Sequence, residues 1–219
     1  MARIARIVVP GCPHHIIQRG NRRQNVFFNE DDKCIYFRSL NENAVKYGIV
    51  FWAYCLMNNH VHFIAVPKYE DSFARGLGQT HKNYSSYINK REGWSGHLWQ
   101  SRFLSFPLDE KHLYAAVRYV ENNPVRVGLV DRAEDFSWSS ARAHMQRVEN
   151  ILISDCYLLK YLHNWGAYLR EDTGEDDNAV IRKYSKTGRP LGDTEFVSEI
   201  ERILSRTITK KKTGPKIIK

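Results

Sequence analysis

The stretch Asn58-Asn59-His60-Val61-His62-Phe63-Ile64-Ala65-Val66-Pro67 is typical of a β-strand that is entered through a tight turn. Asn tolerates positive φ, so the Asn58-Asn59 pair predicts a hairpin turn between this strand and the one before it. Residues i and i+2 of a strand project from the same face. His60 and His62 are therefore expected to converge on one point, which could be a metal ion. The same pattern is also compatible with two half-buried histidines that bind nothing.

A second stretch, Leu113 to Pro124, has the periodicity of a helix. Its apolar residues recur at spacings of three and four and form one stripe. Asp109 predicts the N-cap of this helix. On a helical wheel Tyr119 and Asn123 lie together beside the apolar stripe, so a phenol and an amide could face the histidines as a nucleophile and a third metal ligand. Pro124 disfavours helical backbone at the residue before it, so the helix is expected to end near Asn123.

These stretches resemble the single-tyrosine HUH transposases, and among them the REP-associated tyrosine transposases of bacteria. The resemblance spans roughly residues 8–145 and depends on the order of four runs: Gly11 to Arg22, Leu56 to His62, Leu98 to Phe103, and Arg118 to Arg126. By position, it implies that Tyr119 is the nucleophile and that His60 and His62 are metal ligands. It implies Asn123 as the third ligand.

The composition favours a polyanionic partner. The 219 residues are 42% hydrophobic, which suits one well-cored domain with an appendage. The net charge is +9, and Lys or Arg at a phosphate releases condensed counterions. The first 29 residues contain five arginines and no acid, and the last 15 contain six basic residues and no acid. These two ends of the chain are expected to bind a nucleic-acid backbone, although a soluble basic protein without such a partner would have a similar charge.

Cysteine spacing and hydropathy restrict the class of protein. The four cysteines lack a Cys-x-x-Cys pair, which argues against a zinc ribbon or a disulfide framework: Cys12, Cys34, Cys55 and Cys156. No stretch approaches the roughly 18 apolar residues of a membrane span, and the N-terminus lacks a long apolar segment. We therefore expect a cytoplasmic protein with reduced thiols, and neither a membrane nor a nucleotide cofactor as a partner.

The remaining pattern predicts the fold. Strands are expected at about 15–18, 49–57, 60–67 and 98–106, and helices at about 29–47, 71–91 and 109–123. This order suits an α+β protein with a ferredoxin-like or RRM-like antiparallel sheet and helices packed on one face. The resemblance implies that the histidines lie on a central strand, with the tyrosine helix packed across it.

The character of the chain changes after about residue 147. We expect a catalytic domain at 1–147 and a helical C-terminal extension with a basic tail at 148–219. The acidic run 171–177 is expected to be a solvated loop. Beyond it, residues 196–204 predict a short amphipathic helix that docks on the main domain, and residues 209–216 predict a tail that contacts DNA.

The predicted donor set also indicates the cofactor and the reaction. A phenol with a pKa of about 10 needs nearby positive charge to attack phosphate at neutral pH. Two imidazoles and one amide oxygen leave positions open on an octahedral ion, which favours Mg²⁺ or Mn²⁺ over Zn²⁺. Attack by Tyr119 would form a 5′-phosphotyrosine and release a 3′-hydroxyl, so the strands could be rejoined without ATP.

The resemblance implies single-stranded or hairpin DNA as the substrate, such as a REP element. The residues predicted to bind DNA are all basic: Arg19, Arg22, Arg23, Arg102, Lys210, Lys211 and Lys212. Nearby aromatic residues could stack on bases or could equally belong to the core: Tyr84, Trp94, Trp99 and Phe103. Three questions stay open: a monomer or a homodimer, a transposase or a rolling-circle nicking enzyme with the same chemistry, and an enzyme or a domesticated protein that binds without cutting.

Overall fold

The computed structural model describes residues 5–153, 156–171 and 175–209. Its centre is a four-stranded antiparallel sheet in the order β2-β3-β1-β4. The strands are β1 His14–Arg19, β2 Ile49–Met57, β3 His60–Pro67 and β4 Leu104–Pro107. Asn58 and Asn59 form the turn between β2 and β3, as predicted. The α+β class and the antiparallel sheet of ferredoxin-like topology are thereby confirmed.

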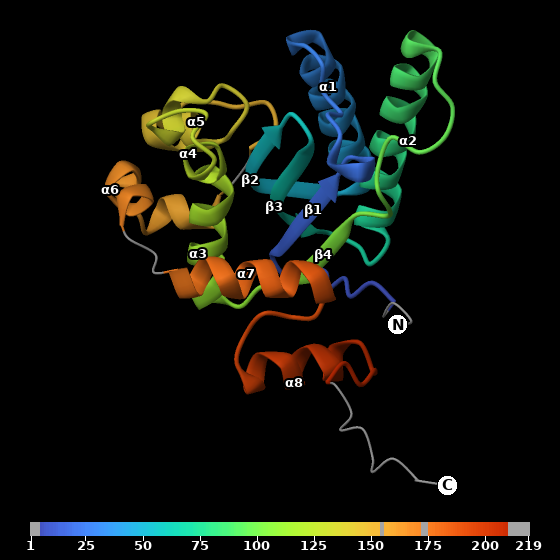
Figure 1. Cartoon of the computed structure of the whole chain (residues 1–219). Helices are drawn as coiled ribbons and strands as arrows, with labels where there is room; N and C mark the ends of the chain where they lie inside the picture. The colour runs from blue at the N-terminus through green and yellow to red at the C-terminus, as the bar shows by residue number, and fades with distance from the viewer. Residues whose placement is uncertain (1–4, 154–155, 172–174, 210–219) are drawn as a thin grey trace, which may run out of the picture.

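Two long helices cover one face of the sheet, α1 Glu30–Tyr47 and α2 Ser72–Glu92 (Figure 1). The side chain of Asn29 caps α1 by accepting from the backbone N–H of Asp32, and Gly48 ends the helix in the left-handed region at φ 64°. The apolar core on this face consists of side chains from both helices and from alternate positions of the strands, among them Leu40, Phe51, Phe63 and Leu77.

The opposite face is covered by α3 Glu110–Glu121 and by the helices after it (Figure 1). The prediction that the helices pack on one face therefore holds only for α1 and α2. The reason is the composition of the central strands, because β2 and β3 are apolar on both faces. Ala53 and Ile64 are fully buried beneath α3, whereas Phe51 and Phe63 face α1 and α2. A sheet that is apolar on both faces must be covered on both.

Further short elements complete the chain. They are η1 Asn21–Arg23, α4 Asn123–Arg126, η2 Ala133–Asp135, α5 Ala141–Gln146, η3 Tyr157–Lys160, α6 Trp165–Arg170, α7 Glu175–Thr187 and α8 Thr194–Ile203. α8 is the predicted amphipathic helix, and Ile200 on it packs against Ile7 and Val9. Its docking on the main domain is thus confirmed.

Two predicted elements differ from the structure. The acidic run was expected to be a loop, but α7 begins at Glu175, because acidic residues are favourable in the first turn of a helix. The strand expected from residue 98 begins only at Leu104. Leu98 and Trp99 are neighbours in sequence and are both buried in the core beneath α1 and α2, which the alternation of a strand does not allow.

A buried carboxylate joins the tyrosine helix to the chain that follows it. Glu121, at the end of α3, is fully buried. It accepts hydrogen bonds from Nε1 of Trp165 (2.7 Å), from Nδ1 of His144 (2.6 Å) and from the hydroxyl of Ser140. Burial lowers the pKa of His144, but the carboxylate of Glu121 and the thiol of Cys156 together outweigh this and raise it to about 10. The domain boundary at residue 147 stays a prediction, since side chains on both sides of it share one core.

In the part of the chain that the structure describes, no helix combines the length and apolarity that crossing a bilayer would require.

Candidate active site

His60 and His62 lie on the same face of β3, beneath α3, with ring centroids 4.9 Å apart. His62 is buried and His60 is partly exposed at the start of the strand. The intervening Val61 is fully buried in the core on the opposite face, beneath α1 and α2. The structure thus brings the two histidines together as strand alternation predicts.

The tautomer of His60 follows from its neighbour Asn59. Nδ2 of Asn59 donates to the backbone carbonyl of Arg23 (3.1 Å), which turns Oδ1 of the same amide toward the histidine. Oδ1 lies 2.6 Å from Nδ1 of His60 and can only accept, so this ring nitrogen carries the proton. The lone pair of His60 is therefore on Nε2, the nitrogen that lies 3.2 Å from the amide of Asn123.

His62 is held from behind by a third histidine, His15 of β1. Nδ1 of His62 lies 2.9 Å from Nε2 of His15. His15 is fully buried, and its Nδ1 has no hydrogen-bond partner in the described structure. A hydrogen bond at Nδ1 leaves Nε2 as the nitrogen of His62 that can bind a ligand.

Burial keeps these imidazoles neutral. It lowers the pKa of His15 and of His60 to about 3, and the positive charge of Arg126 acts in the same direction on both. The pKa of His62 is well below its ordinary value, first because of burial and then because of the other two histidines and the nearby arginines. At neutral pH all three rings can therefore offer lone pairs.

Tyr119 lies on α3 next to the histidines. Its ring centroid is 5.7 Å from that of His62 and 5.9 Å from that of His15. The guanidinium of Arg126, on α4, lies over the face of the Tyr119 ring at 3.9 Å and donates to the backbone carbonyl of Tyr119 (2.7 Å). Burial lowers the pKa of Arg126 and its interaction with Tyr119 raises it, with the net effect downward. A partly desolvated cation thus contacts the predicted nucleophile.

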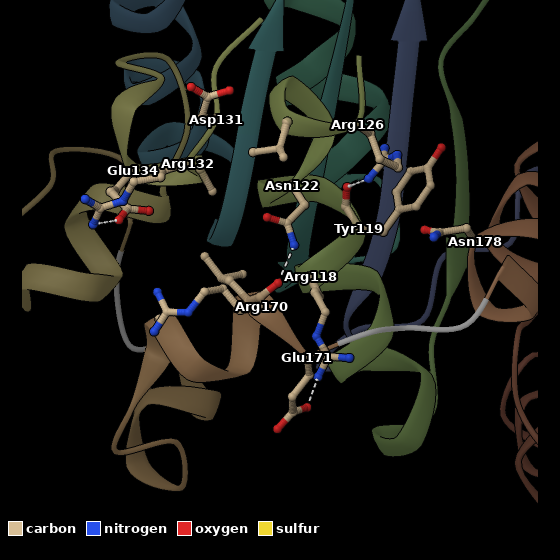
Figure 2. A pocket seen from close by; sticks show the side chains of 14 residues that line it. Arg118, Tyr119, Asn122, Arg126, Asp131, Arg132, Glu134, Arg170, Glu171 and Asn178 are labelled. Atoms are coloured by element: carbon tan, nitrogen blue, oxygen red, sulfur yellow. Dashed lines mark hydrogen bonds and ion pairs between the residues drawn. The ribbon is translucent and has the colours of Figure 1, made fainter. Parts of the chain in front are cut away.

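Tyr119 and Arg126 line a pocket of about 520 Å³ between α3, α4, α6 and α7 (Figure 2). Four arginines line it, and two of them are paired: Arg118 with Glu171 (2.5 Å) and Arg132 with Glu134. Figure 2 shows the hydroxyl of Tyr119 pointing away from the Arg118–Glu171 end of the pocket.

Asn123 occupies the break between two helices. α3 ends at Glu121, and Asn122 is both its C-cap and the N-cap of α4. Asn123 is the first residue of α4 and Pro124 follows it, as expected for a proline near a helix N-terminus. The buried amide of Asn123 faces His60, so the helix ends where the proline predicts and the amide still reaches the histidine.

This donor set fits a divalent cation. Nε2 of His60 accepts a hydrogen bond from Nδ2 of Asn123 (3.2 Å), and Nε2 of His62 makes no hydrogen bond within the described residues. The same residues contain no cluster of three or more His, Cys, Asp or Glu side chains suited to a metal. The candidate ligands are therefore two imidazoles and one amide, a set that leaves positions open.

The predicted DNA-binding residues lie at one end of the sheet, as far as the structure describes them. Arg19 is the cross-strand partner of His60, so its side chain is on the same face. Arg22 and Arg23 are exposed in η1, both at positive φ. Arg102 is exposed in the segment between α2 and β4. Lys210, Lys211 and Lys212 lie outside the described residues.

The aromatic residues near these cations belong mostly to the core. Tyr84, Trp99 and Phe103 are buried beneath α1 and α2, whereas Trp94 is 46% exposed. Of the four, only Trp94 presents a large surface on which a base could stack.

Three residues at the site were not singled out from the sequence: His15, Asn59 and Arg126. Arg126 follows Tyr119 by seven residues, a spacing that places both on one side of a helix and could have indicated it. Asn59 was assigned only to the turn, although its amide is next to His60 in sequence. No sequence signal places His15 behind His62, because that contact depends on the register between β1 and β3.

Residues 8–123, more than half of the chain, match the sequence model of a family described as "Transposase IS200 like". The chain belongs to the IS200-like transposase family. The match covers β1 to α3 and ends at Asn123, so it includes all four predicted active-site residues of this IS200-like transposase. No sequence among curated proteins matches the chain significantly.

One matching solved structure supports the same fold. A REP-associated tyrosine transposase bound to a REP hairpin matches with a TM-score of 0.55 and 19% identity, over 71% of this chain and 93% of that one. A putative transposase from Deinococcus radiodurans R1 matches with a TM-score of 0.38 and 22% identity, over 55% of this chain and 97% of that one. The first match shows that this IS200-like transposase shares its fold with a hairpin-binding protein.

Proposed function

We propose that this IS200-like transposase cleaves and rejoins single-stranded DNA at REP-like hairpins through a covalent link to Tyr119. One observation carries the proposal: the Tyr119 ring lies against the neutral His62, whose Nε2 makes no hydrogen bond within the described residues, and under the guanidinium of Arg126. Nε2 of the neutral His60, on the same strand face, contacts the amide of Asn123. A nucleophile, a donor set for a cation and a fixed positive charge are the parts that tyrosine attack on phosphate requires.

His60, His62 and Asn123 would hold Mg²⁺ or Mn²⁺. Bound there, such an ion would neutralise the charge that develops on a phosphate oxygen. The protein's own contribution is to fix the tautomer of His60 through Asn59, to hold the ring of His62 against His15 and to keep both rings neutral by burial. Mg²⁺ and Mn²⁺ suit this set because it combines few nitrogen donors with open positions for oxygen.

The reaction conserves the energy of the phosphodiester. The Tyr119 oxygen attacks the phosphorus and its phenolic proton passes to solvent. The bond between phosphorus and the 3′-oxygen breaks, and that oxygen takes up a proton to become a 3′-hydroxyl. The other strand end remains attached to Tyr119 as a 5′-phosphotyrosine. Attack of a 3′-hydroxyl on this linkage reverses the sequence and rejoins DNA without an external energy source.

Positive charge at the end of the sheet would hold the DNA. Arg19 lies beside the histidines, and Arg22 and Arg23 extend from η1. Arg102 lies on the opposite face of the sheet, near Gln18. We include Lys210, Lys211 and Lys212 in this proposal on their charge alone. The hairpin named for the matched transposase supports hairpin DNA as the substrate here.

Covalent trapping tests the proposal. The full chain is incubated with labelled oligonucleotides containing REP-like hairpins and single-stranded flanks, in Mg²⁺ or Mn²⁺, and resolved on denaturing gels. We expect a labelled protein band for the wild type that disappears with Tyr119→Phe or EDTA. Tyr69→Phe is the matched control, because Tyr69 is 52% exposed and follows the opposite end of β3 from His60, and it should leave the band unchanged.

Two outcomes would contradict the proposal. Tight binding of the oligonucleotides without any adduct, in both metals, would indicate a protein that binds DNA but does not cut it. An adduct that persists in Tyr119→Phe would show that another residue is the nucleophile, and mass spectrometry of the labelled peptide would identify it.

A further inference from the structure

A second basic groove lies on the other side of the sheet from the candidate active site. It has a volume of about 490 Å³ and lies between α2 and residues 96–103. Its polar lining comes mainly from six side chains: Arg6, Gln18, His81, Lys82, His97 and Arg102. No carboxylate is among the residues that line it. The size is that of a pocket for a small ligand and is too small for a duplex.

Two arginines in this groove lack a counter-charge. The guanidinium of Arg6 is stacked on the ring of Phe103 at 3.8 Å. Within the described residues, the side chains of Arg6 and Arg102 form no ion pair and no hydrogen bond. Burial lowers the pKa of Arg6 to about 10, and the charge of Arg102 adds to the effect. Two cations that repel each other at one pocket make it complementary to an anion.

The groove and the candidate active site lie on opposite faces of β1 and of the segment 98–100, which is hydrogen-bonded along the end of β1. Gln18 and Arg19 are neighbours on β1 and therefore point to opposite faces. The buried Gln18 lines the groove and donates to the carbonyl of Ser101 (2.8 Å), whereas Arg19 pairs with His60. The backbone N–H of Gln100 donates to the carbonyl of Arg19 (2.9 Å), so the segment that walls the groove runs along the same strand.

We propose that this groove binds the single-stranded DNA next to the cleaved phosphate, with backbone phosphates held by Arg6 and Arg102. The inference rests on the proposed function and adds to it a route for the DNA strand across the protein. A strand leaving the histidines passes Arg19, crosses the sheet edge at Gln100 and enters the groove, where Lys82 adds a third positive charge. A flexible single strand can make this turn around one β-strand, and a duplex cannot.

Binding measurements without cleavage test the groove. Fluorescence anisotropy in EDTA compares a labelled REP-like hairpin that carries single-stranded flanks with the same hairpin without flanks. For the flanked probe, Arg6→Gln/Arg102→Gln should raise Kd roughly tenfold and reduce the slope of log K against log salt by about 1.4, since each single-strand phosphate contact contributes about 0.7. The hairpin without flanks should bind both proteins alike.

Arg38→Gln/Lys160→Gln is the matched control, because it removes two exposed positive charges elsewhere. An equal loss of affinity in this control would overturn the proposal that the groove binds DNA and would leave the proposed function intact. The same conclusion would follow if the arginine variant lost as much affinity for the hairpin without flanks. Failure of the wild type to bind either probe would overturn both.

A crosslinking experiment avoids the question of misfolding in the Arg6 variant. Flanks containing 4-thiothymidine are irradiated with the wild-type chain, and the crosslinked peptides are identified by mass spectrometry. We expect crosslinks in the peptides that contain Lys82 and Gln100. Crosslinks confined to α3 and η1 would overturn the proposal, since the strand would then stay on the histidine face.

Discussion

Oδ1 of Asn59 lies 2.6 Å from Nδ1 of His60, and this contact selects the tautomer of a candidate metal ligand. The amide is itself oriented by its hydrogen bond to the carbonyl of Arg23, in η1. The turn that joins β2 to β3 thus has a second role, because it presents Nε2 of His60 to the site as a lone pair.

Replacing Asn59 with Ala should weaken binding of Mn²⁺ by roughly 10- to 100-fold, because the loss of an outer hydrogen bond frees the ring and its tautomer. Isothermal titration or Mn²⁺ electron paramagnetic resonance measures the affinity directly. Asn58→Ala is the control, since Asn58 is the exposed neighbour in the same turn. Equal affinities for the two variants would show that Asn59 does not position His60.

Replacing Arg126 with Met should slow adduct formation by roughly 2- to 30-fold. Met retains much of the apolar stem and removes the charge over the Tyr119 ring, an interaction of about 0.5–2 kcal/mol. Rates are measured by quenching the trapping reaction at successive times. Arg132→Met is the control, because Arg132 lines the same pocket but pairs with Glu134. A wild-type rate for Arg126→Met would exclude an electrostatic role of this residue.

The stability of the fold should fall in mild acid. Burial lowers the pKa of five histidines: His14 to about 4, His15, His60 and His81 to about 3, and His62 well below its ordinary value. Below pH 6.5 the unfolded chain binds protons that the folded chain excludes, so the free energy of unfolding decreases as pH falls from 6.5 toward 3. Each histidine contributes up to about 1.4 kcal/mol per pH unit in this window.

Urea unfolding at pH 7, 6 and 5 measures this dependence, and the midpoint should decrease at each step. Phe substitutions at His14 and His81, outside the candidate metal site, should each make the dependence less steep. A midpoint that does not change with pH would show that these rings are protonated in the folded protein.

Gly20 should not tolerate a side chain. A Cβ there would overlap the backbone carbonyl of Gln24 and would lie 2.8 Å from Cγ1 of Val26. Gly20→Ala is therefore expected to cost about 1–3 kcal/mol of stability and to displace η1. Gly78→Ala is the contrasting variant, since its Cβ meets nothing within 4 Å and a helix gains about 1 kcal/mol from this change. Thermal unfolding gives the melting temperatures of the two variants. Equal melting temperatures would contradict the predicted overlap.

Local sequence patterns predicted most of what brings the candidate site together. Strand alternation placed His60 and His62 on one face, and helical spacing paired Tyr119 with Asn123, because both depend on residues close in sequence. The packing of the tyrosine helix across the histidine strand was implied only by the resemblance. The N-cap at Asp109 is confirmed for the same reason, since its side chain accepts from the backbone N–H of His112. The roles of these residues in catalysis and metal binding stay predictions.

Contacts between distant segments could not be predicted in this way. His15 meets His62 only because β1 and β3 pair in one register, and sequence periodicity does not specify a register. The contribution of helices beyond residue 147, which join α3 in covering the second sheet face, was not predicted because it depends on contacts between distant segments. Both errors concern long-range packing, which overrides local preference.

The carboxylate of Glu121 has a consequence for how this chain can be varied. Glu121 lies inside the family match, but the donors that satisfy it, Ser140, His144 and Trp165, all lie beyond the point where that match ends. A transplanted helix with an uncharged residue at this buried position would leave Ser140, His144 and Trp165 without the carboxylate that they contact. α3 and the segment that contains Trp165 therefore depend on each other, and a chimera whose α3 lacks this carboxylate has to exchange both together.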